Sequence, residues 1–223
     1  MEEQHVSEVI IHNSISLDGS LTNFQPHMGL HYTIARNYQP DIHLIGSNTV
    51  QVGVTLYGNT LPQEEEKDFH RPDRDHRLHY WMVPDTRGLL QGILHACRRF
   101  EFCKDVVILV SETTPKEYID YLTERNYAYH VVGRDHVDLK EMFRLFSEIY
   151  QVKKTLVDTG RILSNLLLES GLVSEISLLI HPVIVGESSY NIFGNIRKNV
   201  NLKLEKEEII EKEYIWLVYK IVR

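Results

Sequence analysis

The chain has 223 residues with 31 acidic and 24 basic side chains and a formal net charge of −7 at pH 7. This length fits one domain with a substantial core, so we expect a single domain over residues 1–223. The acidic balance argues against a nucleic-acid partner. Because no apolar run approaches the roughly 20 residues that cross a bilayer, and residues 1–8 are polar and unlike a secretory signal, we expect a cytoplasmic protein without a membrane partner.

The first predicted strand covers residues 6–15 and ends in a polar segment. In an extended chain Ser14, Ser16 and Asp18 point to one face of the sheet. A strand end of this kind can line a cleft, but the Asp18-Gly19 pair can equally be an ordinary turn. The local pattern leaves both readings open.

The segment at 23–39 is ambiguous: residues 31–37 fit a helix, which Pro40 would end because the residue before a proline leaves helical geometry. A short strand at 41–45 then runs into Gly46-Ser47-Asn48-Thr49, a glycine turn after a strand. Ligands of open α/β sheets gather outside the carboxyl ends of the strands. The turn is therefore a candidate ligand contact.

Residues 52–77 are predicted to be irregular and are rich in histidine towards their end. A metal site is conceivable there, but no histidine pair or carboxylate motif has ligand spacing. A solvated loop is favoured, and no metal is expected. Cys97 and Cys103 fit neither a zinc ligand set nor a disulfide framework, and we interpret them as structural thiols.

Strands and helices alternate in the middle of the chain. Strands are predicted at 79–83, 105–110 and 128–132, and helices at 89–100, 115–125 and 139–150. Thr114 with Glu117 fits a capping box for the second of these helices, and Asp138 is the expected cap of the third.

The segment from 156 to 186 is read as strand, glycine turn, helix, glycine stop and strand. The helix at 162–170 is expected to lie on a sheet through Ile162, Leu163, Leu166 and Leu167. Gly171 suits the left-handed position past a helix C-terminus. The strand at 175–185 is nearly continuously apolar, as in a strand covered on both faces.

The turn at Gly160 carries the chemistry of this segment. A strand that enters a helix through a glycine leaves backbone amides unpaired at the helix N-terminus, where they attract phosphate. Arg161 adds a positive charge at the same end. The turn is not a full G-x-G-x-x-G, so an ordinary strand-to-helix connection remains the alternative.

Two alternating segments at 202–210 and 214–222 predict a terminal antiparallel hairpin. The whole order of elements indicates an α/β fold with right-handed crossovers and a mixed, mostly parallel central sheet with helices on both faces.

Four blocks together resemble a known family. They are Ser16-Leu17-Asp18-Gly19, Ile45-Gly46-Ser47-Asn48-Thr49, Val157-Asp158-Thr159-Gly160-Arg161, and the run from Glu169 to Gly186 that includes His181-Pro182-Val183. Nearly the whole chain is similar to the three-layer dihydrofolate-reductase-like fold, in the branch of the riboflavin biosynthesis pyrimidine reductases.

The resemblance implies an NADPH-dependent reductase, and a homodimer. It implies that Asp18 is the catalytic candidate and that Ser14, Ser16 and Arg36 lie on the substrate side. The cofactor contacts that it implies are Gly46, Ser47, Thr49, Ser111, Thr159, Gly160, Arg161, Ile162 and Leu163.

The reaction implied is reduction of a ribosylaminopyrimidine phosphate to its ribitylamino form. Asp18 would orient or protonate the substrate, or stabilise a cationic imine. The chain departs from the family at Thr159-Gly160-Arg161, where consecutive glycines are usual, at 51–62, and at Asn37, which takes the place of an arginine while Arg36 lies one residue away. A reductase of a pterin or another imine, and a non-catalytic nucleotide-binding protein, therefore remain as alternatives.

Overall fold

The computed structural model describes residues 8–57 and 61–222. They form two compact units, residues 8–40 with 153–222 (unit 1) and residues 41–152 (unit 2). Residues 6 and 7 of the first predicted strand and residues 58–60 of the predicted irregular segment lie outside the described residues. The expectation of a single domain stays a prediction.

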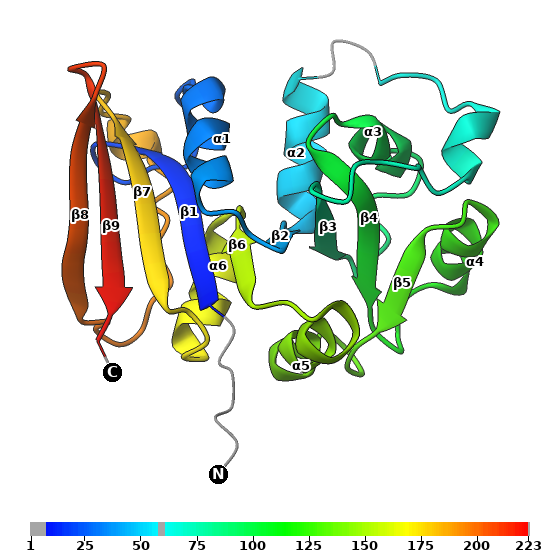
Figure 1. Cartoon of the computed structure of the whole chain (residues 1–223). Coiled ribbons are helices and arrows are strands. Elements are labelled where there is room, and N and C mark those ends of the chain that lie inside the picture. The colour runs from blue at the N-terminus through cyan, green and yellow to red at the C-terminus, as the bar shows by residue number, and fades with distance from the viewer. Residues whose placement is uncertain (1–7, 58–60, 223) are drawn as a thin grey trace. The chain divides into compact units, whose positions relative to one another are not determined.

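Unit 1 is a five-stranded sheet with its helices (Figure 1). Its strands lie in the order β6 (Lys154–Val157), β1 (Glu8–Ser16), β7 (Glu175–His181), β9 (Tyr214–Ile221) and β8 (Leu202–Ile210). β1 is parallel to both β6 and β7, whereas β9 is antiparallel to β7 and β8. The predicted C-terminal antiparallel hairpin is confirmed.

Helix α1 (Met28–Asn37) covers one face of this sheet, and its apolar side explains why. Ile34 packs against Leu179, Trp216 and Val218, and Ala35 packs in a smaller cluster with strand residues of β1 and β6. β6 ends at Val157 opposite Ile11, while β1 continues to Ser16. The later residues of β1 therefore extend past the end of β6.

Helix α6 (Arg161–Glu169) follows β6 and differs from the prediction in its buried face. Gly171 has a φ of +67°, which confirms the left-handed stop. Ile162 and Leu166, expected on the sheet, are 57% and 49% exposed. The buried side chains are Ser164, Asn165, Leu167 and Leu168.

The buried face of α6 is therefore partly polar, and the buried Ser164 hydroxyl donates to the Thr159 carbonyl at 3.4 Å. β7 is also shorter than the predicted strand at 175–185. It ends at His181 because Pro182 has no amide hydrogen for the ladder. A 3-10 turn (η2, Gly186–Ser188) follows in the loop.

Unit 2 is a parallel sheet with helices. Its strands lie in the order β5 (Ala128–Val131), β4 (Cys103–Val110), β3 (His79–Pro84) and β2 (Ile42–Leu44). Its helices are α2 (Ser47–Tyr57), α3 (Leu94–Arg99), α4 (Lys116–Glu124), α5 (Leu139–Tyr150) and a 3-10 helix η1 (Glu66–Phe69). With unit 1, this confirms the predicted mixed, mostly parallel α/β class.

Three local predictions in unit 2 are wrong. The segment at 52–77 is not wholly irregular, because α2 continues to Tyr57 and η1 follows; Val50 and Val54 pack into the core of unit 2, and this packing overrides weak helix propensity. The helix expected at 89–100 begins only at Leu94, because Gly92 has a φ of +83°. The Thr114 hydroxyl accepts from the Ser111 amide instead of capping α4.

Candidate cofactor and substrate site

Hydrogen bonds to Asp18 connect the turn after β1 with the loop after β7. One carboxylate oxygen of Asp18 accepts from the Ser16 hydroxyl at 2.5 Å and from the Val185 amide at 3.1 Å. The other accepts from the Gly186 amide at 2.9 Å. Gly19 has a φ of +82°, which strains any residue with a side chain, and a Cβ there would lie 2.6 Å from Asn191 Nδ2, so the turn favours glycine.

These contacts decide the charge of Asp18. The hydrogen bond from Ser16, followed by those from the Gly186 and Val185 amides, lowers the pKa of Asp18 to about 2. Asp18 is therefore an anion at neutral pH. Its carboxylate is suited to stabilising a nearby positive charge and poorly suited to donating a proton.

The N-terminus of α6 presents unpaired backbone amides. Gly160 is the N-cap residue, with a φ of −74° and no capping side chain. Within residues 8–57 and 61–222, no acceptor pairs with the amides of Arg161, Ile162 or Leu163. This is the arrangement that binds phosphate at a helix N-terminus.

The side chain of Arg161 lies beside these amides in an unusual setting. Its guanidinium stacks on the Tyr190 ring, with 3.7 Å between the guanidinium carbon and the ring centroid. Its Nε is buried and has no hydrogen-bond partner among the described residues. An orphaned cationic donor of this kind fits an anionic ligand. Thr159 is buried, and its carbonyl accepts from Asn13 Nδ2 at 3.0 Å.

A polar face of β1 lies against α1. Ser14 Oγ is 3.1 Å from His31 Nδ1, and His31 Nε2 is 3.3 Å from Asp158 Oδ2. Ser14 and Ser16 lie on one face of the strand, as predicted. The structure thus brings together the carboxyl ends of β1 and β6, with Ser14 and Asp158 joined through His31.

Arg36 lies elsewhere in unit 1. It is in the last turn of α1, and the nearby Tyr38 carbonyl accepts from Lys154, which is in register with Glu8 at the start of β1. Asp18 follows the other end of that strand. The structure therefore does not bring Arg36 next to Asp18, and the predicted substrate contact gains no support from its position.

In unit 2 the predicted glycine turn leads into a helix. The Gly46 carbonyl accepts from the Val50 amide, so Gly46 stands at the start of α2. Among the described residues, the amides of Ser47 and Asn48 have no acceptor. Ser47 and Thr49 are both half-buried at this helix N-terminus.

Ser111 is buried, and its hydroxyl lies 3.2 Å from the Thr113 hydroxyl and 3.5 Å from the Asp135 carbonyl. It supports the rim of a hollow of about 460 Å³ at the carboxyl ends of β3, β4 and β5. The lining residues are Thr86, Arg87, Thr113, Pro115, Asp135 and His136.

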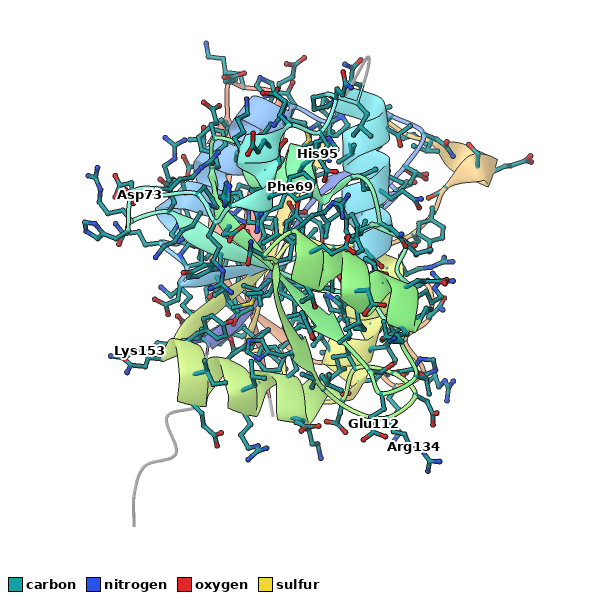
Figure 2. All side chains as sticks on the ribbon, turned by 90° about the vertical axis from the view of Figure 1, so that its right-hand side faces the viewer. Phe69, Asp73, His95, Glu112, Arg134 and Lys153 are labelled. Carbon is teal, nitrogen blue, oxygen red and sulfur yellow. The ribbon has the colours of Figure 1, made fainter. Side chains whose placement is uncertain are left out.

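Hydrogen bonds connect the loops around this hollow. Figure 2 shows Glu112 and Arg134 side by side, and the Glu112 amide donates to the Gly133 carbonyl at 3.1 Å. Sequence reasoning missed the lining residues. The available signal was their position, because they follow three predicted parallel strands.

In the part of the chain that the structure describes, no group of three or more His, Cys, Asp or Glu side chains could hold a metal ion. None of the described helices is both long enough and apolar enough to cross a membrane.

Comparison with protein families identifies the chain. A family model described as the RibD C-terminal domain matches residues 7–216. The chain belongs to the RibD C-terminal domain family. This membership confirms the predicted resemblance to the riboflavin-reductase branch of the dihydrofolate-reductase-like fold. A search of curated protein sequences gives no significant match.

Solved structures share the fold at low sequence identity. A pyrimidine reductase-like protein of Corynebacterium diphtheriae is 16% identical with a TM-score of 0.72, over 97% of this chain and 92% of that one. The riboflavin biosynthesis reductase of Saccharomyces cerevisiae is 21% identical with a TM-score of 0.68, over 100% and 93%. RibD of Acinetobacter baumannii is 14% identical with a TM-score of 0.66, and the match covers 98% of this chain but only 59% of RibD.

Proposed function

We propose that the protein is an NADPH-dependent reductase of the riboflavin type, which reduces the ribosylamino group of a diaminopyrimidine or aminouracil phosphate to a ribitylamino group. The family match supports this reaction class. The observation that carries the proposal is the set of unpaired amides of Arg161, Ile162 and Leu163 beside an orphaned Arg161 Nε, because both fit a diphosphate.

The residues present suit NADPH. In unit 1, Thr159 and Gly160 would shape the turn, while the three amides and the Arg161 guanidinium would hold the diphosphate. In unit 2, the family resemblance assigns Gly46, Ser47 and Thr49 at the start of α2, and Ser111, to contacts with the nucleotide. When bound, NADPH would supply the hydride.

Asp18 would act on the substrate through its charge. Ring opening of a ribosylamine produces a cationic imine, and an ionised carboxylate stabilises that cation. The low pKa of Asp18 assigns it this electrostatic role and leaves the proton to another group. Ser16, which donates to Asp18, would hold the carboxylate in position. A homodimer, as the family resemblance implies, is also part of the proposal.

A pterin or another flat imine is the second candidate substrate. Leu17 and Ile184 are 61% and 70% exposed, and the Leu17 amide donates to the Val183 carbonyl, so apolar side chains stand beside the Asp18 turn. These exposed apolar side chains would pack better against a flat heteroaromatic ring than against a sugar phosphate.

One experiment separates the two substrates. NADPH oxidation is followed with the ribosylaminopyrimidine phosphate and, in parallel, with a panel of pterins and cyclic imines, while NADPH binding is measured by fluorescence titration. The proposal expects the pyrimidine to be the best substrate. Turnover of only a pterin or imine would favour the second candidate, and NADPH binding without turnover of any compound would indicate a non-catalytic protein.

A further inference from the structure

A chain of hydrogen-bonding groups runs through unit 1 from a buried histidine to the surface. His31, on α1, has a side chain that is 4% exposed, and it lies between Ser14 on β1 and Asp158 just after β6. Ser14 is half-buried at the later part of β1, beyond the point where β6 ends. The three residues therefore connect a buried ring to the strand end that carries the Asp18 turn.

The neighbouring His12 is excluded from this chain of groups. Its Nε2 lies 3.2 Å from the His31 carbonyl, which can only accept, so Nε2 carries the hydrogen. Its Nδ1 then accepts from the Ser177 hydroxyl at 2.9 Å, and that hydroxyl accepts from Trp216 Nε1. Burial and the nearby His31 lower the pKa of His12 to about 3. His12 is thus a neutral, fully bonded platform on which His31 stacks, with 4.4 Å between ring centroids.

The donor pattern at His31 depends on a single proton. Asp158 can only accept, so His31 Nε2 carries a hydrogen in either charge state. When His31 is neutral, Nδ1 accepts from the Ser14 hydroxyl, whose hydrogen then points inward. When His31 is protonated, Nδ1 donates to Ser14 Oγ and the Ser14 hydrogen is free to point outward.

We propose that Ser14, His31 and Asp158 form a proton relay that protonates the substrate at the carboxyl end of β1. The proposal rests on the proposed reductase function and adds the source of the proton. Ser14 is the group that would touch the substrate. His31 and Asp158 act through it as positioning residues.

The relay would supply the proton that opening of the sugar ring requires. As the bond between the anomeric carbon and the ring oxygen breaks, the amine nitrogen forms a double bond to that carbon, and the ring oxygen takes the Ser14 proton. Ser14 recovers its proton from His31 Nδ1, and His31 is reprotonated from solvent. The anomeric carbon of the imine is then reduced by hydride, so one proton and one hydride are consumed per turnover. Asp18 cannot supply this proton, because it is ionised.

The ring orientation also distinguishes the relay from a nucleophilic triad. In serine proteases the serine pairs with Nε2 and the acid with Nδ1, whereas here Ser14 pairs with Nδ1 and Asp158 with Nε2. Among the described residues, the ionisable groups facing His31 are His12 on β1, Asp158 after β6, His181 on β7 and, on its own helix, Tyr32. Asp158 is the carboxylate among them, 3.3 Å from His31 Nε2.

The test compares pH profiles of kcat for the intact protein with those of two variants at position 14. Ser14→Ala removes the hydroxyl from a half-buried position, and Ser14→Thr retains it. We expect Ser14→Ala to lower kcat by about 100-fold and to abolish the fall in rate towards high pH. Ser14→Thr should restore most of the rate and the pH dependence. Affinity for NADPH should be the same in all three proteins.

A second measurement does not depend on turnover. The ring-nitrogen signals of His31 are recorded by NMR in the substrate-free parent protein, in Ser14→Ala and in Asp158→Asn, which retains the shape of the side chain. We expect the Nε2 signal to change in Asp158→Asn and the Nδ1 signal to change in Ser14→Ala, because each substitution removes the partner of that nitrogen.

The outcomes separate the relay from the proposed function. If the intact protein reduces the pyrimidine and Ser14→Ala keeps its rate and pH profile, the relay is overturned and the reductase stands. If the intact protein turns over no substrate, the proposed function fails, and the proton-delivery role fails with it. Ring-nitrogen signals of His31 that are unchanged in both Asp158→Asn and Ser14→Ala would overturn the hydrogen-bonded relay in either case.

Discussion

Asp18 uses both carboxylate oxygens within the protein, and this shapes its chemistry. The Val185 and Gly186 amides and the Ser16 hydroxyl all donate to it. Its folded pKa is depressed, so these bonds stabilise the turn above about pH 4 and are lost as the pH falls towards about 2. At any pH where a reductase works, Asp18 is a fixed anion.

Replacing this anion tests its electrostatic role. Asp18→Asn should lower turnover by about 100-fold, because the neutral amide no longer stabilises the cationic imine, while affinity for NADPH changes little. Turnover and NADPH fluorescence titration measure the two effects. Ser20→Ala is the matched control, because Ser20 Oγ accepts from the Tyr190 amide in the same turn without carrying charge. If both variants lose the same turnover, Asp18 acts only by holding the loop.

Gly160 and Gly171 lie at opposite ends of α6. We expect a substitution at Gly160 to change NADPH affinity and one at Gly171 to change stability. Gly160 has a φ of −74°, which any residue adopts, so Gly160→Val should fold normally and weaken NADPH binding by crowding the diphosphate. Gly171 has a φ of +67°, so Gly171→Ala should cost about 1 kcal/mol of stability and leave NADPH binding unchanged. Fluorescence titration and urea unfolding give both values. Equal NADPH affinity of Gly160→Val and the parent would remove the diphosphate from this turn.

At the scale of elements, the short helix α3 depends on one buried ion pair. Arg98 is 2% exposed and donates to Asp105 at 2.8 Å. It also donates to the carbonyls of Asp68, Arg125 and Asn126 and stacks on Tyr127 at 3.8 Å from its ring centroid. A helix of six residues has little stability of its own, so these contacts fix α3 on unit 2.

Removing this guanidinium should be costly. Arg98→Met leaves the Asp105 charge buried and three carbonyls without a donor, and we expect it to lose about 3–5 kcal/mol of unfolding free energy. Urea denaturation measures the loss. The double variant with Asp105→Asn should recover part of it, because the buried charge is removed. A loss below about 1 kcal/mol would mean that the pair behaves like a surface ion pair.

The elements that could be predicted are those with a strong local cause. Asp138 caps α5 as expected, and its carboxylate accepts from the Lys140 and Glu141 amides at 2.9 Å. Thr114 has similar sequence context but bonds to Ser111, because the turn after β4 competes for its hydroxyl. The buried face of α6 also depends on tertiary partners, which periodicity alone does not contain.

Much of the candidate site also depends on tertiary contacts and could not be predicted from the sequence. The strand–glycine–helix pattern predicted the amides of α6, which are local. The relay joins Ser14 to His31 across 17 positions and His31 to Asp158 across 127 positions. Only the packing of α1 on the sheet brings these residues together. The hollow in unit 2 likewise requires the order of three strands.

At the scale of the whole molecule, buried neutral His12 makes stability depend on pH. Its folded pKa of about 3 lies below the ordinary 6.5, so the unfolded chain binds the extra proton first as the pH falls. Stability from this group is complete above about pH 6.5 and declines towards pH 3. We expect a loss of about 1 kcal/mol per pH unit between about pH 6 and pH 4.

Comparison of two pH series measures this effect. Urea unfolding at several pH values should give a shallower slope for His12→Asn than for the parent protein, even if the variant is less stable throughout. Other histidines with depressed pKa, such as His181, act in both proteins and cancel in the difference. Identical slopes would show that His12 does not remain neutral in the folded protein.

Following the transferred hydrogen tests the proposed reduction most directly. The protein is given the ribosylaminopyrimidine phosphate with NADPH that carries deuterium at its transferable position, and the product is examined by NMR and mass spectrometry. We predict a ribitylamino product with one deuterium on the former anomeric carbon and an equal amount of oxidised cofactor. Unchanged pyrimidine, in a protein that binds NADPH and folds normally, would contradict the account.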